Sequence, residues 1–366
     1  MESKDLIQKR KIIHKQKKPK TKTKTKANKQ FNYGLALLKS ILAFLVVIRH
    51  NFDPRSTKNK IILKITSRNI LFHVPSFFIM SFYFMYKNLL SLNPKIILNR
   101  FMRLLIPYIG WPIIIFNINR FLNKYFNKKL KDSYLLLKYQ FLYGGAQFLL
   151  TFWYSWNLIA ITLLFILIIF IFRKHALFIL QIILICSYVV QYTEYHYKNI
   201  VLKYPNYNKF VIASLFESIP FSVTGFTLGY YKILDILKRH KIKSFILSII
   251  IYKVIIDYNI FTRIKGVVFQ GIDLNIQSIC IIFIFSLFPS EKIKNEYLSN
   301  FLIIITNYTA GVYYLHVPIH WYFEDYIDSI KNRTFIGAII NYLICYFICF
   351  IGIKIFGKTP IKYLFC

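Results

Sequence analysis

The chain has 366 residues, of which 56% are hydrophobic and 19% aromatic, and its formal net charge is +35 at pH 7. This proportion of apolar residues excludes an ordinary water-soluble domain of this size and predicts an integral membrane protein. Twelve of the 49 basic residues lie in the first thirty positions, and most others flank apolar runs, a pattern that argues against a nucleic-acid-binding surface.

The first segment, residues 1–32, is a basic low-complexity tract that includes "KKPKTKTKTK". It contains no apolar region of its own, and its repeated like charges oppose compaction. We therefore expect a disordered cytosolic tail here. A membrane domain over residues 33–355 and a short cytosolic C-terminal tail over residues 356–366 are expected to follow it.

Apolar runs of about 17 to 25 residues, the length that spans a bilayer, recur along the rest of the chain. They predict an all-α, polytopic membrane protein with about ten transmembrane helices, near residues 34–52, 69–90, 104–120, 151–172, 176–192, 209–231, 242–258, 272–289, 301–322 and 335–353. An even number of spans puts both termini in the cytosol. The count of Lys and Arg favours this orientation only when the N-terminal tract is included.

The first apolar run, "LALLKSILAFLVVIRHNF" (35–52), contains ionisable residues inside a predicted membrane helix. Lys39 and His50 are eleven residues apart, so both side chains face the same side of a helix, about 16 Å apart along its axis. Ionisable groups at membrane depth are costly and usually face a cavity or a protein partner. Alternatively, Lys39 extends to the inner headgroups while His50 and Arg49 lie in the outer interface.

Two arginines precede the third predicted span. Arg100 and Arg103 lie one helical turn apart, and basic residues in such positions commonly flank a membrane helix on its cytosolic side. The predicted topology places these two arginines and Lys39 at the cytosolic level. It places a second set of residues at the outer level: His50, His73, Trp153, Glu217 and His316.

Several other features leave alternatives open. Glu217 is the only carboxylate deep inside an apolar run, so we expect it to be protonated or paired, in either a catalytic or a structural role. The loop 121–150 contains Gly144–Gly145 and is either a re-entrant helix or an amphipathic segment on the membrane surface. No metal site is expected, because the five cysteines are not spaced as zinc ligands are. They are Cys186, Cys280, Cys345, Cys349 and Cys366.

Six stretches resemble, in order, parts of the acyltransferase-3 family, the integral membrane O-acyltransferases that modify polysaccharides and other extracytoplasmic glycans. The resemblance covers about residues 33–355. Its most specific parts are the basic residue eleven positions before His50, the Arg-x-x-Arg at Arg100 and Arg103, and the Tyr-Leu-His-x-Pro around His316. The stretches are "LALLKSILAFLVVIRHNF", "HVPSFFIMSFYFMYK" (73–87), "RFMRLLIPYIGW" (100–111), "FWYSWNLIAI" (152–161), "PFSVTGFTLGYY" (220–231) and "YTAGVYYLHVPI" (308–319).

This resemblance implies transfer of an acetyl or other short acyl group from acyl-CoA, such as acetyl-CoA, to a glycan hydroxyl at the cell surface. His50 matches the proposed catalytic histidine, and an imidazole can remove and return a proton at neutral pH. The other implied roles are catalytic for Glu217 and His316, donor-binding for Lys39, Arg100 and Arg103, and acceptor-binding for His73 and Trp153. Trp153 is alternatively an interfacial belt residue. Membrane lipid and other surface-polysaccharide biosynthesis proteins are the implied partners.

Two departures from the family pattern affect these expectations. Lys39 stands where the family usually has Arg, so donor phosphates lose bidentate recognition. The run Ser81-Phe82-Tyr83 replaces the usual Ser-Gly-Phe, and a bulky ring there is expected to change the packing of the second span. The alternative function is a transporter or flippase of lipid-linked sugars or surface polysaccharide. The internal repeats and paired broken helices typical of transporters are absent from the sequence.

Overall fold

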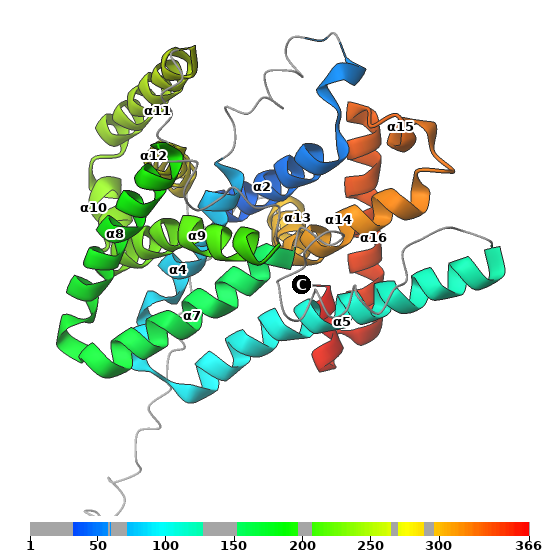
Figure 1. Cartoon of the computed structure of the whole chain (residues 1–366), viewed down its shortest axis with the longest axis horizontal. Helices are drawn as coiled ribbons and strands as arrows, with labels where there is room; N and C mark the ends of the chain where they lie inside the picture. Colours follow the sequence, from blue (N-terminus) through cyan, green and yellow to red (C-terminus); the bar gives the residue numbers. More distant parts are fainter. Residues whose placement is uncertain are drawn as a thin grey trace, which may run out of the picture. The chain divides into compact units, whose positions relative to one another are not determined.

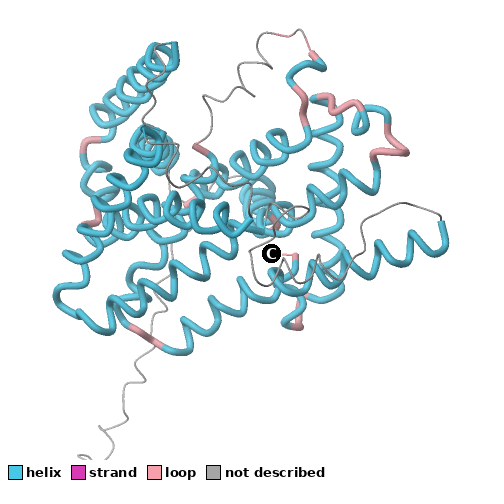
Figure 2. The backbone as a smooth tube through the Cα atoms, in the orientation of Figure 1, coloured by secondary structure: helices cyan, strands magenta, loops and turns pink. Residues whose placement is uncertain are grey.

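The structure, a computed structural model, describes residues 32–57, 59, 72–126, 152–196, 207–264, 270–288 and 296–365. Within these ranges the chain forms helices joined by short loops and contains no strand (Figure 2). The N-terminal lysine tract and Gly144–Gly145 lie outside them, so the disordered tail and the re-entrant segment remain predictions.

Within the described residues, eleven α-helices coincide with the ten predicted spans, because α13 and α14 together occupy one of them (Figure 1). Short connecting helices lie between some of them. The α-helices are α2 (Tyr33–Asn51), α4 (His73–Ser91), α5 (Pro94–Phe126), α7 (Trp153–Phe172), α8 (Ala176–His196), α9 (Tyr207–Tyr230), α10 (Ile233–Arg239), α11 (Lys241–Ile264), α12 (Gln270–Ser286), α13 (Glu296–Asn307), α14 (Thr309–Phe323), α15 (Asp328–Lys331) and α16 (Phe335–Phe356). The 3-10 helices are η1 (Pro54–Ser56), η4 (Arg173–His175) and η5 (Pro360–Leu364).

The expected count of ten membrane crossings is not confirmed. Among the described residues, four segments are long and apolar enough to cross a membrane, and the bent pair α13 and α14 makes a fifth if it is one span. Other helices at predicted positions are shorter or more polar, as in α12, where Asp273, Asn275 and Gln277 are buried. The four segments are Tyr33–Asn51, Pro94–Tyr125, Trp153–Val190 and Phe335–Phe356.

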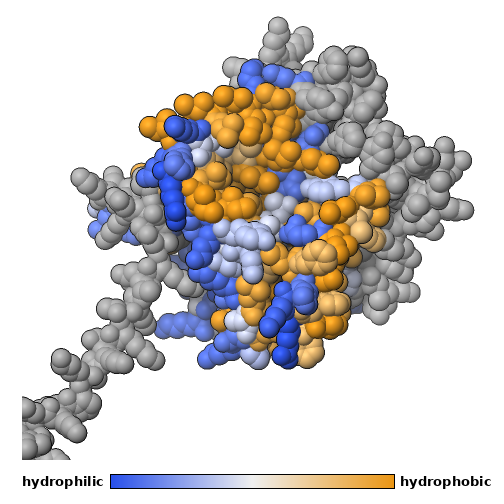
Figure 3. Space-filling view, turned by 90° about the vertical axis from the view of Figure 1, so that its left-hand side faces the viewer, coloured by the Kyte–Doolittle hydropathy of each residue, from blue (hydrophilic) through white to orange (hydrophobic). Residues whose placement is uncertain are grey.

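Large hydrophobic side chains are exposed along several helices. Phe178 and Ile185 of α8 are 65% and 62% exposed, and Ile242 of α11 is 76% exposed. Figure 3 shows broad hydrophobic areas on one face of the protein. Soluble proteins rarely expose apolar areas of this extent, whereas the hydrocarbon core of a bilayer solvates them. The helices are therefore those of an integral membrane protein.

Helix α2 is surrounded by other helices. It packs against α4, α12, α13, α14 and α16. The Asn32 side chain caps its N-terminus by accepting a hydrogen bond from the Leu35 N–H at 3.0 Å. Leu38, Leu42 and Val47 are completely or almost completely buried on its packed face. Because α2 is continuous, the positions of Lys39 and His50 relative to each other are fixed by the helix.

Helices α4 and α9 approach each other closely at glycines of α9. Gly225 lies against the Ile79 carbonyl, where a Cβ would overlap that backbone oxygen, and Gly229 lies against Tyr86 and the Tyr83 carbonyl. Small residues permit such close contact between membrane helices. Phe82, at the position where the family commonly has glycine, is fully buried and lies 4.8 Å from Phe165 between ring centroids. The close contact between α4 and α9 therefore depends on the glycines of α9 and not on a glycine of α4.

Gly225→Ala is expected to destabilise the protein by about 1–3 kcal/mol, because α4 and α9 must separate to admit the methyl group. The midpoint of thermal unfolding in detergent measures this effect. Ser222→Ala, one turn away, is the matched control because it removes only a hydroxyl that bonds to the Ser218 carbonyl at 3.0 Å. A wild-type midpoint for Gly225→Ala, or an equal loss in both variants, would contradict the close packing.

The predicted span 301–322 is not one continuous helix, because the structure divides it at Tyr308 into α13 and α14, which are bent by 57° relative to each other. Side-chain hydroxyls compensate the interrupted backbone. Thr309 Oγ1 donates to the Thr306 carbonyl at 2.8 Å, and Tyr346 Oη donates to the Ile305 carbonyl at 2.7 Å. Broken helices are tolerated in membranes where other groups satisfy the freed carbonyls in this way.

Candidate active site

The two predicted catalytic histidines meet at one end of α2. The ring centroids of His50 and His316 are 5.2 Å apart and the rings are tilted by 46°. His316 is fully buried in α14, whereas His50 is exposed at the last turn of α2. We call His50, His316 and His320, described below, the histidine end of the site. Its arrangement lets an accessible imidazole act beside a fixed, buried one.

Hydrogen bonds fix the orientation of His316. Its Nδ1 lies 3.3 Å from the Val312 carbonyl. Because a carbonyl only accepts, Nδ1 carries the proton in this contact and Nε2 keeps its lone pair. Among the described residues Nε2 has no hydrogen-bond partner. The Asn341 amide donates to the His316 carbonyl at 2.8 Å, which ties α14 to α16. His316 therefore presents a proton acceptor at the histidine end.

His320 is a site residue that the sequence reasoning missed. It lies one turn after His316 on α14 and is 4% exposed. Its Nε2 is 3.6 Å from a Glu324 carboxylate oxygen, and neither ring nitrogen has a hydrogen-bond partner within the described part of the chain. The four-residue spacing between the two histidines, which places them on one helix face, was the available signal.

Lys39, near the other end of α2, interacts with Arg103 of α5, and Arg100 lies one turn before Arg103 on the same helix. We call Lys39, Arg100 and Arg103 the cationic end of the site. Arg100 donates to Ser81 Oγ at 3.0 Å and to Thr162 Oγ1 at 3.4 Å, and its guanidinium lies over the Phe82 ring. Lys39 is half-buried and interacts electrostatically with Arg103, which is exposed. Since α5 begins at Pro94, both arginines lie inside the helix rather than before the predicted span at 104.

A row of aromatic side chains, which the sequence did not reveal, joins the two ends. Arg100 interacts electrostatically with Tyr154 of α7. The ring centroids of Tyr154 and Tyr313 are 5.1 Å apart, and those of Tyr313 and His316 are 6.0 Å apart. Tyr314, beside this row, shares a hydrogen bond with Ser155. Contacts between neighbouring side chains therefore lead from the cationic end to the histidine end.

The remaining predicted site residues occupy separate helices. His73 is buried at the first turn of α4, and Trp153 is half-buried at the first turn of α7, with its ring 6.3 Å from that of Phe78. The Glu217 side chain is exposed on α9, and the expectation that it is protonated or paired stays a prediction. The packed face of α9 is instead the serine face, where Ser214 and Ser218 accept hydrogen bonds from Asn157. The roles of these three residues stay predictions.

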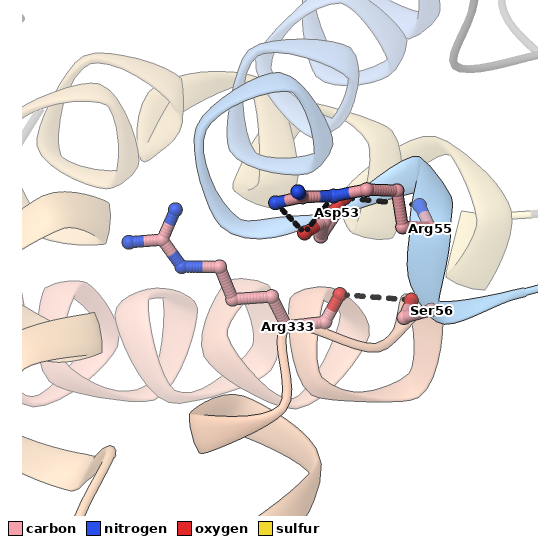
Figure 4. Close-up of polar contacts among 4 residues, drawn as sticks. All are labelled: Asp53, Arg55, Ser56 and Arg333. Carbon is pink, nitrogen blue, oxygen red and sulfur yellow. Dashed lines mark hydrogen bonds and ion pairs between the residues drawn. The ribbon is translucent and has the colours of Figure 1, made fainter.

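The loop after α2 is held against the turn before α16 (Figure 4). The Asp53 N–H donates to the Arg333 carbonyl at 2.9 Å, and the Ser56 hydroxyl donates to the same oxygen at 3.3 Å. Asp53 also accepts hydrogen bonds from Arg55, which hold the pKa of its carboxyl below the usual range. The Arg333 side chain extends away from this pair and interacts electrostatically with His320. The loop therefore borders the histidine end.

Arg333 has a left-handed backbone, with φ of 48°, which is unfavourable for any residue except glycine. Arg333→Gly is expected to stabilise the protein by about 1 kcal/mol, because glycine adopts this conformation without strain. Arg333→Ala is the matched control, since it removes the same guanidinium but retains the strain. Thermal unfolding should rank glycine above both alanine and the wild type. A lower midpoint for glycine than for alanine would contradict the backbone assignment.

No group of three or more His, Cys, Asp or Glu side chains is placed to hold a metal ion in the described ranges. The sequence profile of the acyltransferase domain family, acyltransferase-3, matches residues 32–356. Comparison with curated proteins and with solved structures found no match. The profile match contains both ends of α2 and the aromatic row between them. Because it covers nearly the whole chain, the protein belongs to the acyltransferase-3 family.

Proposed function

We propose that this membrane acyltransferase moves an acetyl or other short acyl group from acyl-CoA to a hydroxyl of an extracytoplasmic glycan. Membership of the family implies membrane O-acyltransferase activity. The observation that best supports the proposed donor and acceptor is that the two ends of α2 differ in chemistry. Cationic side chains lie at one end and the paired histidines His50 and His316 lie at the other. The phosphates of the donor suit the first end, and a hydroxyl acceptor suits the second.

In this proposal His50 is the general base. Its imidazole removes the proton from the acceptor hydroxyl while the oxygen attacks the thioester carbonyl. The carbon–sulfur bond then breaks, and the imidazolium returns the proton to the leaving thiolate. The products are a glycan ester and free CoA, so no proton is gained or lost overall. No metal takes part in these steps.

His316 has a positioning role in this reaction. Its Nε2, with a free lone pair, is directed by the Nδ1 contact with Val312 and lies in the ring adjacent to His50. It can accept a hydrogen bond from either the His50 ring or the incoming hydroxyl, which would hold the reacting groups in the required orientation. His320 and Glu324 continue the same line of polar groups along α14.

The cationic end binds the donor in this proposal. Lys39 and the exposed Arg103 meet the phosphates, while Arg100, fixed by Ser81 and Thr162, starts the aromatic row. The acyl-bearing arm of the donor would follow that row toward His50. This arrangement is consistent with a plasma-membrane protein whose termini lie on the donor side, in the cytosol.

Mass spectrometry of surface carbohydrate from cells with and without the gene tests this function. The expected result is a glycan that loses acetyl or related acyl groups but keeps its sugar composition and amount when the gene is deleted. Loss of the glycan itself from the surface, with acylation unchanged on what remains, would indicate a transporter and contradict the proposal.

A further inference from the structure

Residues 356–365, within the predicted C-terminal tail, pack against the helices before them. The Trp111 indole N–H donates to the Leu364 carbonyl at 2.8 Å, and Tyr363 Oη donates to Asn99 Oδ1 at 3.0 Å. Phe365 stacks on Phe356 with an interplanar angle of 4°. These contacts hold η5 against α5 and α16, close to the arginines of the cationic end.

Two cations of different elements share the ring of Tyr363. The guanidinium carbon of Arg103 lies 5.6 Å from the ring centroid, and the Lys362 Nζ lies 5.5 Å from it. Lys39 of α2 also interacts electrostatically with Arg103. Three separate elements, α2, α5 and η5, therefore bring positive charges to one place.

No carboxylate side chain of these elements balances that charge. Helix α2, helix α5 and the sequence from Thr334 to the C-terminus contain no Asp or Glu. Within the described ranges no ion pair involves Lys39, Arg103 or Lys362. Like charges held together repel one another, and the cation–π contacts with Tyr363 offset only part of this cost. A bound anion would relieve the repulsion.

We propose that Lys362 and Tyr363 of η5 complete, with Arg103, a phosphate-binding site. The planar guanidinium can grip phosphate oxygens in pairs, and the lysine adds a point charge. The Tyr363 hydroxyl is engaged by Asn99, so its ring serves to position the two cations. The inference rests on the proposed function for the identity of the phosphate, which we assign to the nucleotide part of acyl-CoA. A phosphate headgroup of an anionic lipid has the same chemistry and is distinguished by experiment.

Kinetics of the full chain with three donors test the assignment. Acetyl-CoA carries all the phosphates, acetyl-3′-dephospho-CoA lacks one, and S-acetylpantetheine lacks all of them. Lys362→Gln is expected to raise the KM for acetyl-CoA about tenfold, with kcat and the KM for S-acetylpantetheine unchanged. Lys241→Gln is the matched control, because it removes the same charge at an exposed position at the start of α11. An equal KM increase for acetyl-CoA and S-acetylpantetheine would overturn the inference.

The same assays in nanodiscs separate the two phosphate sources. In discs of phosphatidylcholine alone, the Lys362→Gln effect on acetyl-CoA should persist. An effect that appears only when phosphatidylglycerol is added would assign the site to lipid and overturn the donor assignment. If the wild-type protein transfers acetyl from none of these donors, the proposed function fails, and the phosphate site is tested by the binding of CoA itself. Loss of CoA binding in Lys362→Gln would then still support the phosphate site. Equal CoA binding by both proteins, or none by either, overturns the site.

Discussion

The His50→Ala variant is expected to transfer acyl groups about 10²–10⁴ times more slowly than the wild-type protein. A positioned general acid–base group contributes rate factors of this size, and the proposed mechanism uses this imidazole for both proton transfers. Transfer of radiolabelled acetyl from acetyl-CoA into glycan, measured with purified protein in vesicles, gives the rate. The KM for acetyl-CoA should change little, because the proposed binding site for the donor phosphates lies at the other end of α2.

Two variants control this experiment. His175→Ala removes an imidazole that is exposed in η4, between α7 and α8, and it should retain the wild-type rate. His50→Gln keeps a polar side chain that cannot take up a proton, so it should be as slow as alanine. A His50→Ala variant that keeps more than about a tenth of the wild-type rate would contradict general-base catalysis by this residue.

The second large effect concerns Lys39, where glutamine is expected to raise the KM for acetyl-CoA about 10–100-fold. A hydrogen bond to a charged group contributes about 1.5–3 kcal/mol, and about 1.4 kcal/mol corresponds to a factor of ten. Lys39→Arg retains the charge and presents a planar guanidinium that can bind phosphate through two parallel hydrogen bonds, so its KM should equal or fall below that of the wild type. Initial rates over a range of acetyl-CoA concentrations measure both variants.

Stability measurements separate binding from folding for this residue. Lys39 and Arg103 repel each other, so Lys39→Gln removes an unfavourable interaction and should unfold at or above the wild-type temperature. A raised KM together with undiminished stability is the signature of a binding residue. An unchanged KM, or a KM that rises only because the protein unfolds, would remove Lys39 from the donor site.

Much of the fold was predictable because hydrophobic length is a strong signal in a membrane protein. The first predicted span, 34–52, differs from α2 by one residue at each end. The eleven-residue spacing also placed Lys39 and His50 on one face, because an unbroken helix has a fixed rotation per residue. The pairing of His50 with His316 agrees with their common predicted level.

Other features depended on information that apolar runs do not carry. Helix α9 is apolar around most of its circumference, so no periodicity indicated that Glu217 would lie outside the packed serine face. The break at Tyr308 depends on hydroxyl groups of α14 and α16 that satisfy freed carbonyls. The docking of η5 depends on the single indole hydrogen bond and tyrosine contacts described above, which join positions more than 250 residues apart.

The central claim is that donor and acceptor meet the protein at opposite ends of α2, and therefore on opposite sides of the membrane. Sealed vesicles containing the purified protein in one orientation, with glycan inside and labelled acetyl-CoA supplied either outside or inside, test it most directly. In vesicles whose protein has the N-terminal end of α2 outside and His50 toward the glycan inside, the account predicts labelled glycan only when acetyl-CoA is supplied outside. The His50→Ala variant should give no labelled glycan in either case. Equal labelling when donor and glycan share the side that His50 faces would contradict it.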